Sequence, residues 1–531
     1  MTKKRLLYVA AEISPFANAG GLGEVGRSFP KALQESKDYE IRRVMPKHKS
    51  VGEELIYVTD YPVAMEQGFE TCVVKTDNGN EDPVTYFITN DRYFHRDNLY
   101  GYEDDGVRYY FFCRAVVELI KRMDFKPDII QANDWHTGML LLLIKKEFPE
   151  IKTVFTIHNI SYQGYIPASY LNGIINMKEQ YALGWPEWLN FMKAGILYSD
   201  LLTTVSPGYC QEIKKPEQGC GMTGLIEQRE NKMIGILNGI DTDNYDPMTE
   251  GELIFPYDSE HAERKQKNRT WLREHYKLPE DDRPLVAMIT RLDYAKGIDI
   301  LLKAISFFDF SKLQLIILGS GNPYYQGLLA SITAGYPESI AVDFEYSSIT
   351  AKRIYAGADI YLMPSLFEPC GLGQLYAMRY GCVPVVNPVG GLRDTVIEDR
   401  ENPENSNGFY MSEWSGQALN EALNRALTAY HSSDWKFYRK NCMMYDSSWK
   451  RSVEEYKKWF TALLEKKPDN EVNSEKKEKA AKPGKTEKTE KVVKHEKTVK
   501  QGETVKPEKA VKPRKTVKPE MVKETKKRKH E

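Results

Sequence analysis

The sequence predicts an α/β protein built from two doubly wound domains. Short apolar, β-rich runs alternate with helical patterns over most of the 531 residues. Continuous apolar strands between helices are typical of parallel sheets that are covered on both faces. The runs fall into two series, and a chain of this length usually forms two or three domains. We therefore expect two domains that face a cleft, with ligands bound at the carboxyl ends of the strands.

Each domain is predicted from its own series of strands. The first series lies at 6–11, 128–132, 153–157, 200–205 and 235–237. The second lies at 285–290, 313–318, 340–344, 359–363 and 383–386. Helical patterns between the strands include 297–307, 351–356 and 371–380. This alternation predicts a Rossmann-like sheet from each series.

Changes of composition divide the chain into five segments. The two Rossmann-like domains are expected at 1–245 and 283–433, with a charged, proline-containing junction at 246–282. The segment 434–467 is rich in Trp, Tyr and Phe, so we expect a helical segment whose apolar face docks across both domains. The segment 468–531 is expected to form a disordered tail.

The tail differs in charge from the rest of the chain. From Lys466 to Glu531 there are 23 lysines and arginines against 12 acidic residues, whereas the whole chain has a net charge of −1. Lysine recurs at every third position from Lys482 to Lys500, and aromatic residues are absent after Pro468. Such a segment cannot bury enough apolar surface to offset the entropy of ordering it. It serves either as a solubilising appendage or as a contact for an acidic partner.

Composition also excludes several classes of protein. No run of about 18 apolar residues exists, so we expect neither a membrane-spanning helix nor a membrane partner. The seven cysteines are odd in number and spaced for neither a zinc site nor a disulfide framework, which indicates the reducing cytoplasm. We expect no metal, no cofactor and no nucleic acid partner.

Two turns that suit an anion follow the first strand of each predicted domain. In the first domain, Asn18, Gly20 and Gly21 lie in a glycine-rich turn that opens a helix, where backbone N–H groups can meet an anion. In the second, Arg291 and Lys296 flank a turn after the strand 285–290. A planar guanidinium and a compact ammonium together suit a diphosphate. The alternatives are glycines that serve the turn alone and a solvated basic loop.

A carboxylate lies beside a second glycine-rich turn. Glu368 precedes Pro369, and we expect a helix to begin at Gly371, with a similar turn at Gly390 and Gly391. Carboxylates accept strong hydrogen bonds, and helix N-termini receive phosphate groups. The pattern predicts recognition of sugar hydroxyls next to a phosphate.

Two histidines follow strands of the first domain. Asp134 and His136 come after 128–132, and His158 follows 153–157. A single histidine of this kind is more often structural, but two at strand ends favour the lining of a site. We expect Asp134 to be the first-domain carboxylate nearest to the reaction.

With these motifs, the chain resembles the glycogen and starch synthase family of two-domain glucosyltransferases. The resemblance runs from about Lys4 to Trp459 and leaves the tail outside. Its carriers are Gly20-Gly21-Leu22-Gly23-Glu24-Val25, Asn133-Asp134-Trp135-His136, Thr156-Ile157-His158-Asn159, Asn238-Gly239-Ile240-Asp241, Glu368-Pro369-Cys370-Gly371-Leu372 and Gly390-Gly391-Leu392. The resemblance implies a GT-B fold and no essential metal. It also implies transfer of glucose from ADP-glucose to the non-reducing end of glycogen or a malto-oligosaccharide, with retention of the α configuration.

The resemblance assigns a role to each candidate residue. In catalysis, Arg291 and Lys296 would bind the diphosphate, Glu368 would hold the glucose hydroxyls, His158 would line the anomeric side and Asp134 would contact the sugar. Further donor contacts would come from Asn18, Gly20, Gly21, Asn238, Gly371, Leu372, Gly390, Gly391 and Tyr346, the last by stacking on adenine. Tyr93 and His136 would lie on the acceptor side.

Three positions depart from the family pattern. Asn18 stands where a lysine usually contacts the donor, so recognition of the donor's charge would rest more on Arg291 and Lys296. If the missing cation matters, Asn18→Lys should tighten donor binding; if Asn18 belongs to a local network, it should not. Tyr376 stands where many related enzymes have a second Glu, and Gly373 replaces a frequent Thr.

Retention requires either a covalent intermediate or attack from the same face as the leaving group. Because paired carboxylates at the spacing of a double displacement are not evident, we expect front-face attack, with the diphosphate taking the acceptor's proton. Arg291, Lys296 and the helix start at Gly371 would stabilise the leaving group, and domain closure would exclude water. The alternatives are a related glycosyltransferase that uses UDP-glucose or another acceptor, a phosphorylase, and a catalytically idle glucan-binding protein.

Overall fold

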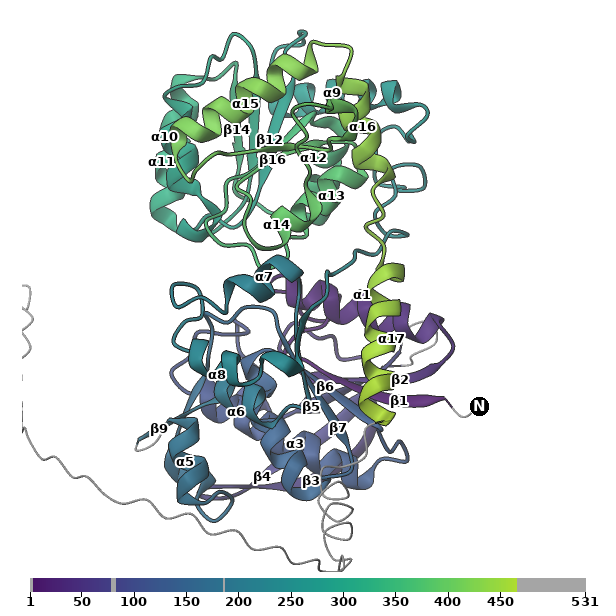
Figure 1. Cartoon of the computed structure of the whole chain (residues 1–531), viewed down its shortest axis with the longest axis vertical. Helices are drawn as coiled ribbons and strands as arrows, with labels where there is room; N and C mark the ends of the chain where they lie inside the picture. The colour runs from purple at the N-terminus through teal and green to yellow at the C-terminus, as the bar shows by residue number, and fades with distance from the viewer. Residues whose placement is uncertain (1–2, 78–82, 185–186, 466–531) are drawn as a thin grey trace, which may run out of the picture. The chain divides into compact units, whose positions relative to one another are not determined.

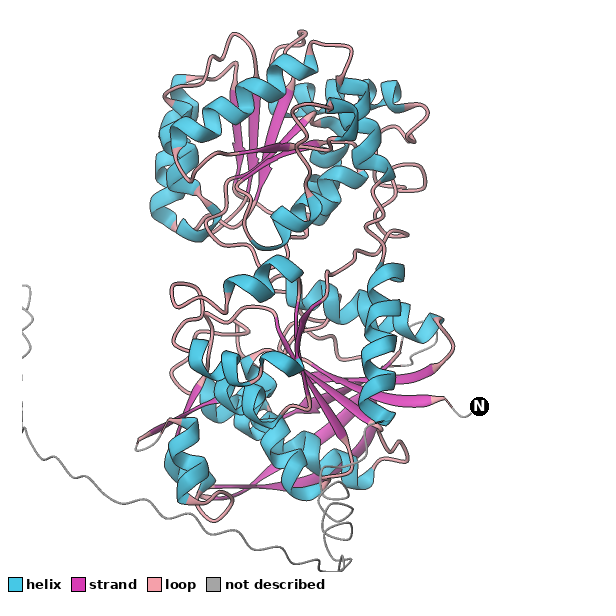
Figure 2. Cartoon of the chain, in the orientation of Figure 1, coloured by secondary structure: helices cyan, strands magenta, loops and turns pink. Residues whose placement is uncertain are grey.

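Two parallel-stranded sheets, each flanked by helices, organise the chain (Figures 1 and 2). The computed structural model describes residues 3–77, 83–184 and 187–465. We call the first sheet with its helices the first lobe, and the second sheet with its helices the second lobe. The predicted pair of doubly wound domains is confirmed. The segment predicted as a disordered tail, 468–531, lies outside the described residues.

The first sheet has nine strands in the order β11-β10-β7-β6-β1-β2-β5-β4-β3. The parallel strands are β1 (Lys4–Val9), β2 (Tyr39–Pro46), β5 (Val84–Thr89), β6 (Ile129–Asn133), β7 (Lys152–Ile157), β10 (Leu201–Thr204) and β11 (Met233–Gly235). An antiparallel hairpin of β3 (Ile56–Met65) and β4 (Gly68–Thr76) extends the sheet beyond β5. The strand order reverses between β1 and β6, and the loops after these two strands meet there.

Helices cover both faces of the first sheet. They are α1 (Gly21–Glu35), α2 (Asp91–Phe94), α3 (Asp105–Arg122), α4 (Gly138–Glu147), α5 (Met177–Leu183), α6 (Phe191–Tyr198), α7 (Pro207–Glu212) and α8 (Thr223–Gln228), with a small antiparallel pair, β8 (Tyr165–Pro167) and β9 (Trp188–Asn190). Helix α4 contains the apolar run 139–144, and every side chain of this run is buried. A helix that is apolar all round must be enclosed, and α4 packs against both α3 and α6.

The second sheet has six parallel strands in the order β14-β13-β12-β15-β16-β17. These are β12 (Leu285–Ile289), β13 (Gln314–Leu318), β14 (Ile340–Asp343), β15 (Ile360–Met363), β16 (Val383–Val386) and β17 (Phe409–Tyr410). Its helices are α9 (Lys265–Tyr276), α10 (Ile298–Ile305), α11 (Pro323–Gly335), α12 (Ser348–Gly357), α13 (Gly373–Arg379), α14 (Gly390–Thr395) and α15 (Gly416–Tyr430). Here the order reverses between β12 and β15, which is where doubly wound sheets bind ligands.

The last two helices pack on different lobes. In α16 (Trp435–Met444), the ring of Tyr438 stacks on Phe409 of the second sheet, with centroids 4.7 Å apart. Helix α17 (Trp449–Glu465) lies beside α1 (Figure 1). The ring of its Tyr456 is 4.6 Å from that of Phe29 in α1. Helix α17 therefore completes the core of the first lobe, although it follows the second lobe in sequence.

The predicted junction, 246–282, contains a helix that belongs to the second lobe. Helix α9 packs on α12, and its Lys265 is buried. The Lys265 ammonium donates to the carbonyl oxygens of Tyr355 (2.7 Å), Ala356 (2.8 Å) and Tyr380 (3.1 Å). A charged composition had indicated a connecting segment, but here a charged residue satisfies three backbone carbonyls inside the fold.

Strands β2 to β5 were not among the predicted runs. β5 carries no charged residue and was missed although it is largely apolar, whereas charged residues interrupt β2, β3 and β4. In β2, for example, Arg43 is buried and its Nε donates to the hydroxyl of Thr85 in the neighbouring strand at 3.0 Å. Among the helices of the described ranges, none combines the length and apolar character that crossing a membrane requires.

Candidate active site

Asp134 joins the loops that follow β6 and β7. Its φ of +57° lies in the left-handed region, which few residues other than glycine adopt. Its Oδ1 accepts the N–H groups of His158 at 2.7 Å and Asn159 at 3.1 Å. Burial raises the pKa of this carboxyl to about 7, although the two amides favour the ionised form. Asp134 thus holds the loop that carries His158, and its predicted contact with the sugar stays a prediction.

His158 is a neutral imidazole with a defined tautomer. Burial lowers its pKa to about 3. The side-chain amide of Asn133 donates to the carbonyl of Val9 at 3.0 Å, which orients its Oδ1 toward Nε2 of His158, also at 3.0 Å. Because Asn133 Oδ1 only accepts, Nε2 carries the proton and Nδ1 is left with a lone pair.

The glycine-rich turn after β1 is organised by a residue that sequence reasoning did not select, Glu12. This carboxylate is 4% exposed and accepts the N–H of Ala19. Burial raises its pKa to about 7, while the amides of Ala19 and Gly20 and the charge of Arg291 act in the opposite direction. An acidic residue directly after a buried strand was the available signal. Glu12 thereby fixes the backbone of the turn directly before Gly20 and Gly21.

Asn18 forms a local network within this turn. Its Oδ1 accepts the N–H of Gly20 at 3.1 Å, and its Nδ2 donates to Oε1 of Glu24 at 2.6 Å. Gly20 is the N-cap of α1 and, as a glycine, has no side chain that could cap the helix. The side chain of Asn18 therefore ties the turn to the first turn of α1.

In the second lobe, Lys296 and Glu368 come together at the reversal point of the sheet. The Lys296 ammonium lies 2.7 Å from Oε2 of Glu368, and the hydroxyl of Ser365 donates to the same oxygen at 3.0 Å. The Glu368 side chain is nearly buried, whereas that of Arg291 is 59% exposed and lies 3.7 Å from Asp293. This end of the sheet thus holds a carboxylate with two donors, Lys296 and Ser365, while Arg291 pairs with Asp293.

The turn after Glu368 differs from the predicted one. Gly371 has a φ of +71°, and α13 begins at Gly373 with Leu372 as its N-cap, so the prediction that a helix starts at Gly371 is corrected. The left-handed glycine turns the chain, and one further residue, Leu372, precedes the first residue of the helix. A Cβ on Gly21 would lie 3.6 Å from the Leu372 side chain, so the glycine turns of the two lobes lie close together.

Gly390 and Gly391 pack closely against the backbone of the loop that carries Glu368. A Cβ on Gly390 would lie 2.1 Å from the carbonyl oxygen of Glu368, and one on Gly391 would lie 2.1 Å from that of Cys370. The N–H of Gly390 donates to Glu212 and that of Gly391 to the carbonyl of Glu368. Both amides are engaged within the protein. The donor contact predicted for these glycines stays a prediction.

Tyr346 and Asn238 occupy different surroundings. Tyr346 is 61% exposed. An exposed ring suits stacking on a base. Asn238 is buried beside Cys370, and its backbone N–H donates to the carbonyl of Val205 at 3.3 Å. The donor contacts predicted for both stay predictions.

The two residues predicted on the acceptor side are buried. His136 stacks on Trp135 with centroids 4.1 Å apart and lies 4.6 Å from Tyr100, and burial lowers its pKa well below the ordinary range. Tyr93 is 3% exposed and lies against Phe111. Both residues are part of an aromatic cluster in the first lobe, and their predicted place on the acceptor side stays a prediction.

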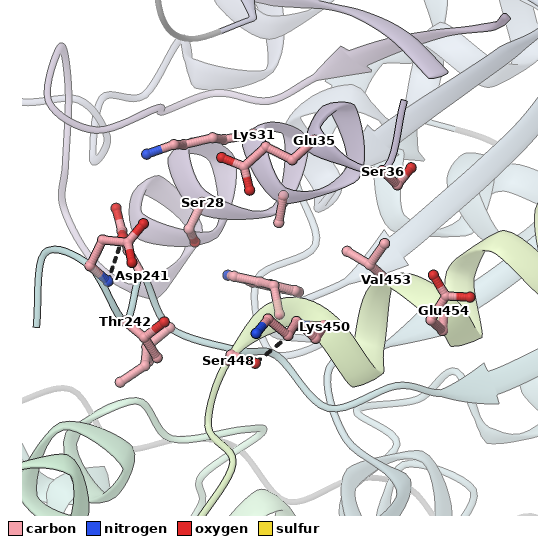
Figure 3. A pocket seen from close by; sticks show the side chains of 14 residues that line it. Ser28, Lys31, Glu35, Ser36, Asp241, Thr242, Ser448, Lys450, Val453 and Glu454 are labelled. Atoms are coloured by element: carbon pink, nitrogen blue, oxygen red, sulfur yellow. Dashed lines mark hydrogen bonds between the residues drawn. The ribbon is translucent and has the colours of Figure 1, made fainter. Parts of the chain in front are cut away.

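A cavity lies away from the predicted site residues, between α1, the loop 240–243 and α17. Its volume is about 420 Å³, and Lys31 and Glu35 of α1 line it together with Lys450 and Glu454 of α17 (Figure 3). None of the predicted site residues lines it. In the part of the chain that the structure describes, no three His, Cys, Asp or Glu residues gather as they would around a metal ion.

Both lobes match known protein families. Residues 5–228 match the family described as the starch synthase catalytic domain, and residues 272–440 match glycosyl transferases group 1. A glycogen synthase of Moorella thermoacetica is 40% identical over 479 residues, covering 87% of this chain and 97% of that protein. A glycogen synthase of Geobacillus stearothermophilus is 36% identical over 478 residues, covering 87% and 98%.

Solved structures agree with these sequence matches. The catalytic domain of starch synthase IV from Arabidopsis thaliana, bound to ADP and acarbose, superposes with a TM-score of 0.82 at 30% identity, covering 88% of this chain and all of that one. A sucrose-phosphate synthase of Thermosynechococcus elongatus matches with a TM-score of 0.59 at 16% identity and covers 87% and 99%, a likeness of fold alone.

Proposed function

The chain belongs to the glycogen and starch synthase family and is a hexosyltransferase of glycogen synthesis, and from this premise we propose its donor, stereochemistry and site chemistry. The proposed donor is ADP-glucose. The proposed acceptor is the non-reducing end of glycogen or of a malto-oligosaccharide, and the α configuration is retained. The family membership supplies a nucleotide sugar and a glucan as substrates.

One observation carries the assignment of the site, the pairing of Lys296 with Glu368. Transfer from a nucleotide sugar requires cations at the diphosphate and hydrogen-bond acceptors at the glucose. The contact of 2.7 Å between Lys296 and Glu368 places a cation for the diphosphate directly beside a hydrogen-bond acceptor for the glucose. The exposed guanidinium of Arg291 adds a second cation that is open to solvent.

The carboxylates favour front-face attack over a covalent intermediate. Asp134 accepts two backbone amides, and Glu368 accepts from Lys296 and Ser365, so each is engaged as a hydrogen-bond acceptor rather than placed as a nucleophile. In the proposed step, the acceptor hydroxyl oxygen bonds to the anomeric carbon while the bond from that carbon to the diphosphate breaks on the same face. The hydroxyl proton passes to the departing diphosphate oxygen, and Arg291 and Lys296 stabilise the charge that develops there.

The choice of adenine rests on the second lobe. Tyr346 offers an exposed ring at the start of α12, and the related starch synthase IV structure contains ADP and acarbose. We propose that Tyr346 stacks on the base and that the glucan approaches from the side of His158. Transfer is proposed to need neither a metal ion nor an organic cofactor, because Arg291 and Lys296 supply the positive charge.

Two proposals concern the setting of the enzyme. A cytoplasmic location is supported by the cysteines: all seven are free, and six of them are buried. A contact between the lysine-rich segment from Lys466 and an acidic partner is a proposal from charge alone.

The donor proposal is tested by measuring nucleotide release with glycogen as acceptor. We expect ADP release from ADP-glucose, unchanged by EDTA, at a rate at least about tenfold above UDP release from UDP-glucose. Equal rates, or faster use of UDP-glucose, would overturn the adenine assignment, and loss of transfer in EDTA would overturn the proposal that no metal is needed.

A further inference from the structure

Helix α7 of the first lobe forms hydrogen bonds with the loop of the second lobe that carries Glu368 and with neighbouring residues of α14. The hydroxyl of Ser206, the N-cap of α7, donates to the carbonyl of Pro369 at 2.5 Å. The N–H of Gly208 donates to Oδ2 of Asp394 at 2.6 Å. At the other end of α7, Oε1 of Glu212 accepts the N–H of Gly390 at 2.7 Å. Three hydrogen bonds therefore join three residues of the first lobe to three residues in the donor-side loops of the second.

The Glu212 contact acts on the backbone that positions Glu368. Gly390 has a φ of +46° and lies so close to the Glu368 carbonyl that a Cβ there would be 2.1 Å away. The backbone of Gly390 thus packs directly against that of Glu368. The hydrogen bond from Gly390 to Glu212 holds the Gly390 backbone in this position. Glu212 is itself 4% exposed, and its second oxygen is buried without a hydrogen-bond partner in the described part of the chain. A buried carboxylate that makes one hydrogen bond to a backbone amide is costly to stability, so fold stability alone does not explain it.

The same helix also reaches the His158 loop. The hydroxyl of Tyr209 accepts the N–H of Ile160, two residues after His158, at 2.8 Å. Its ring packs against Phe367, the residue before Glu368, with centroids 5.3 Å apart in an edge-to-face arrangement. Helix α7 therefore links His158 of the first lobe to Glu368 of the second through two short chains of contacts.

We propose that α7 sets the spacing between His158 and Glu368, and that Glu212 is a positioning residue for glucose transfer. Glu212 touches neither substrate in this account; it acts through Gly390 on Glu368. The reason for a rate effect is geometric, because a displacement of about 1 Å in a reacting group can lower the rate about 10²-fold. The proposal rests on the proposed roles of His158 and Glu368 in transfer.

The test compares Glu212→Ala with Glu212→Gln in the full chain. Glutamine retains an oxygen that can accept the Gly390 N–H, and alanine does not. We expect kcat of Glu212→Ala to fall about 10- to 100-fold, and that of Glu212→Gln to stay within about threefold of the wild type. ADP affinity, measured by calorimetry, should change less than about threefold in both, because α7 contacts neither Arg291 nor Lys296. Glu227→Ala, an exposed change on α8, is the matched control and should leave both quantities unchanged.

Three outcomes would overturn the proposal. These are an unchanged kcat in Glu212→Ala, equal losses in the alanine and glutamine variants, and a loss of ADP affinity that parallels the loss of kcat. If Glu212→Ala does not fold, Tyr209→Phe supplies the second test, because it removes only the hydroxyl that accepts the Ile160 N–H. We expect its kcat to fall about fivefold or more with ADP affinity retained, and a kcat within twofold of the wild type would refute the role of α7. Wild-type transfer is measured first, so that failure of the proposed function itself is recognised separately.

Discussion

Asn18 offers a quantitative test of how the glycine turn is held. Its Oδ1 accepts the Gly20 N–H at 3.1 Å, and its Nδ2 donates to Glu24 at 2.6 Å. In Asn18→Lys, the acceptor for Gly20 is lost, which costs about 0.5–1.5 kcal/mol. The new ammonium can pair with Glu24, and an exposed ion pair of this kind returns about 0.2–1 kcal/mol.

The two effects nearly cancel, and the lysine charge is held by Glu24 rather than offered to a diphosphate. We therefore expect Asn18→Lys to change the dissociation constant of ADP-glucose less than about threefold and to lower the thermal midpoint by no more than a few degrees. This outcome follows from the local network and not from a missing cation.

A double-mutant cycle with Glu24→Gln makes the reasoning testable. In the double variant, the ammonium is no longer neutralised, and a charge-assisted hydrogen bond exceeds a neutral one by about 1 kcal/mol. We expect the double variant to bind ADP-glucose about fivefold more tightly than Glu24→Gln alone, at low salt. Calorimetry and thermal melts of the four proteins give the comparison. Tightening of fivefold or more in Asn18→Lys alone would refute the account, because Glu24 would then not retain the lysine.

Three further predictions follow from the contacts of individual residues. Arg291→Ala and Lys296→Ala should each lower kcat about 10²–10³-fold. Only Lys296→Ala should also lower the thermal midpoint, because it leaves Glu368 without its cation. A decrease in kcat below threefold in both variants would show that neither residue belongs to the site. Glu368→Ala should lower kcat at least about 10³-fold while the protein stays folded, and retained activity with an unchanged melting curve would contradict its assignment. Burial lowers the pKa of His136 well below its value in the unfolded chain, so the free energy of unfolding falls as the pH drops below about 6.5. Relative to His136→Phe, the wild type should therefore lose about 2 kcal/mol of stability between pH 7 and pH 5. If urea melts show the same difference in stability between the two proteins at both pH values, His136 is not buried.

Fold class was predictable because buried parallel strands are continuous apolar runs. The predicted strand at 383–386 has the bounds of β16, and the loops after 285–290 and 359–363 brought Arg291, Lys296 and Glu368 to one end of the second sheet. This needed only the rule that parallel strands of one sheet share their carboxyl ends. The hairpin of β3 and β4 was missed because one face is exposed and its residues alternate rather than form a run.

The finer roles depend on burial and backbone conformation, which spacing does not report. His136 is the third residue after β6, where a site residue could lie, but its ring is enclosed by Trp135, Tyr100 and Tyr109. Gly390 and Gly391 are adjacent glycines at a helix start, which predicts an anion site, yet their amides bind Glu212 and the Glu368 carbonyl. Glu12 was missed because its partner is a backbone amide, that of Ala19, which no sequence motif marks. Glu212 was missed because its partner, the N–H of Gly390, lies in a remote segment of the chain.

The most direct test of the central claim is to follow the reaction of ADP-glucose with maltotriose by proton NMR. The account predicts that one ADP appears for each glucose transferred, and that the new linkage shows the anomeric signal of an α-1,4 bond at the non-reducing end. A β-configured product, or release of free glucose without extension of the acceptor, would contradict it.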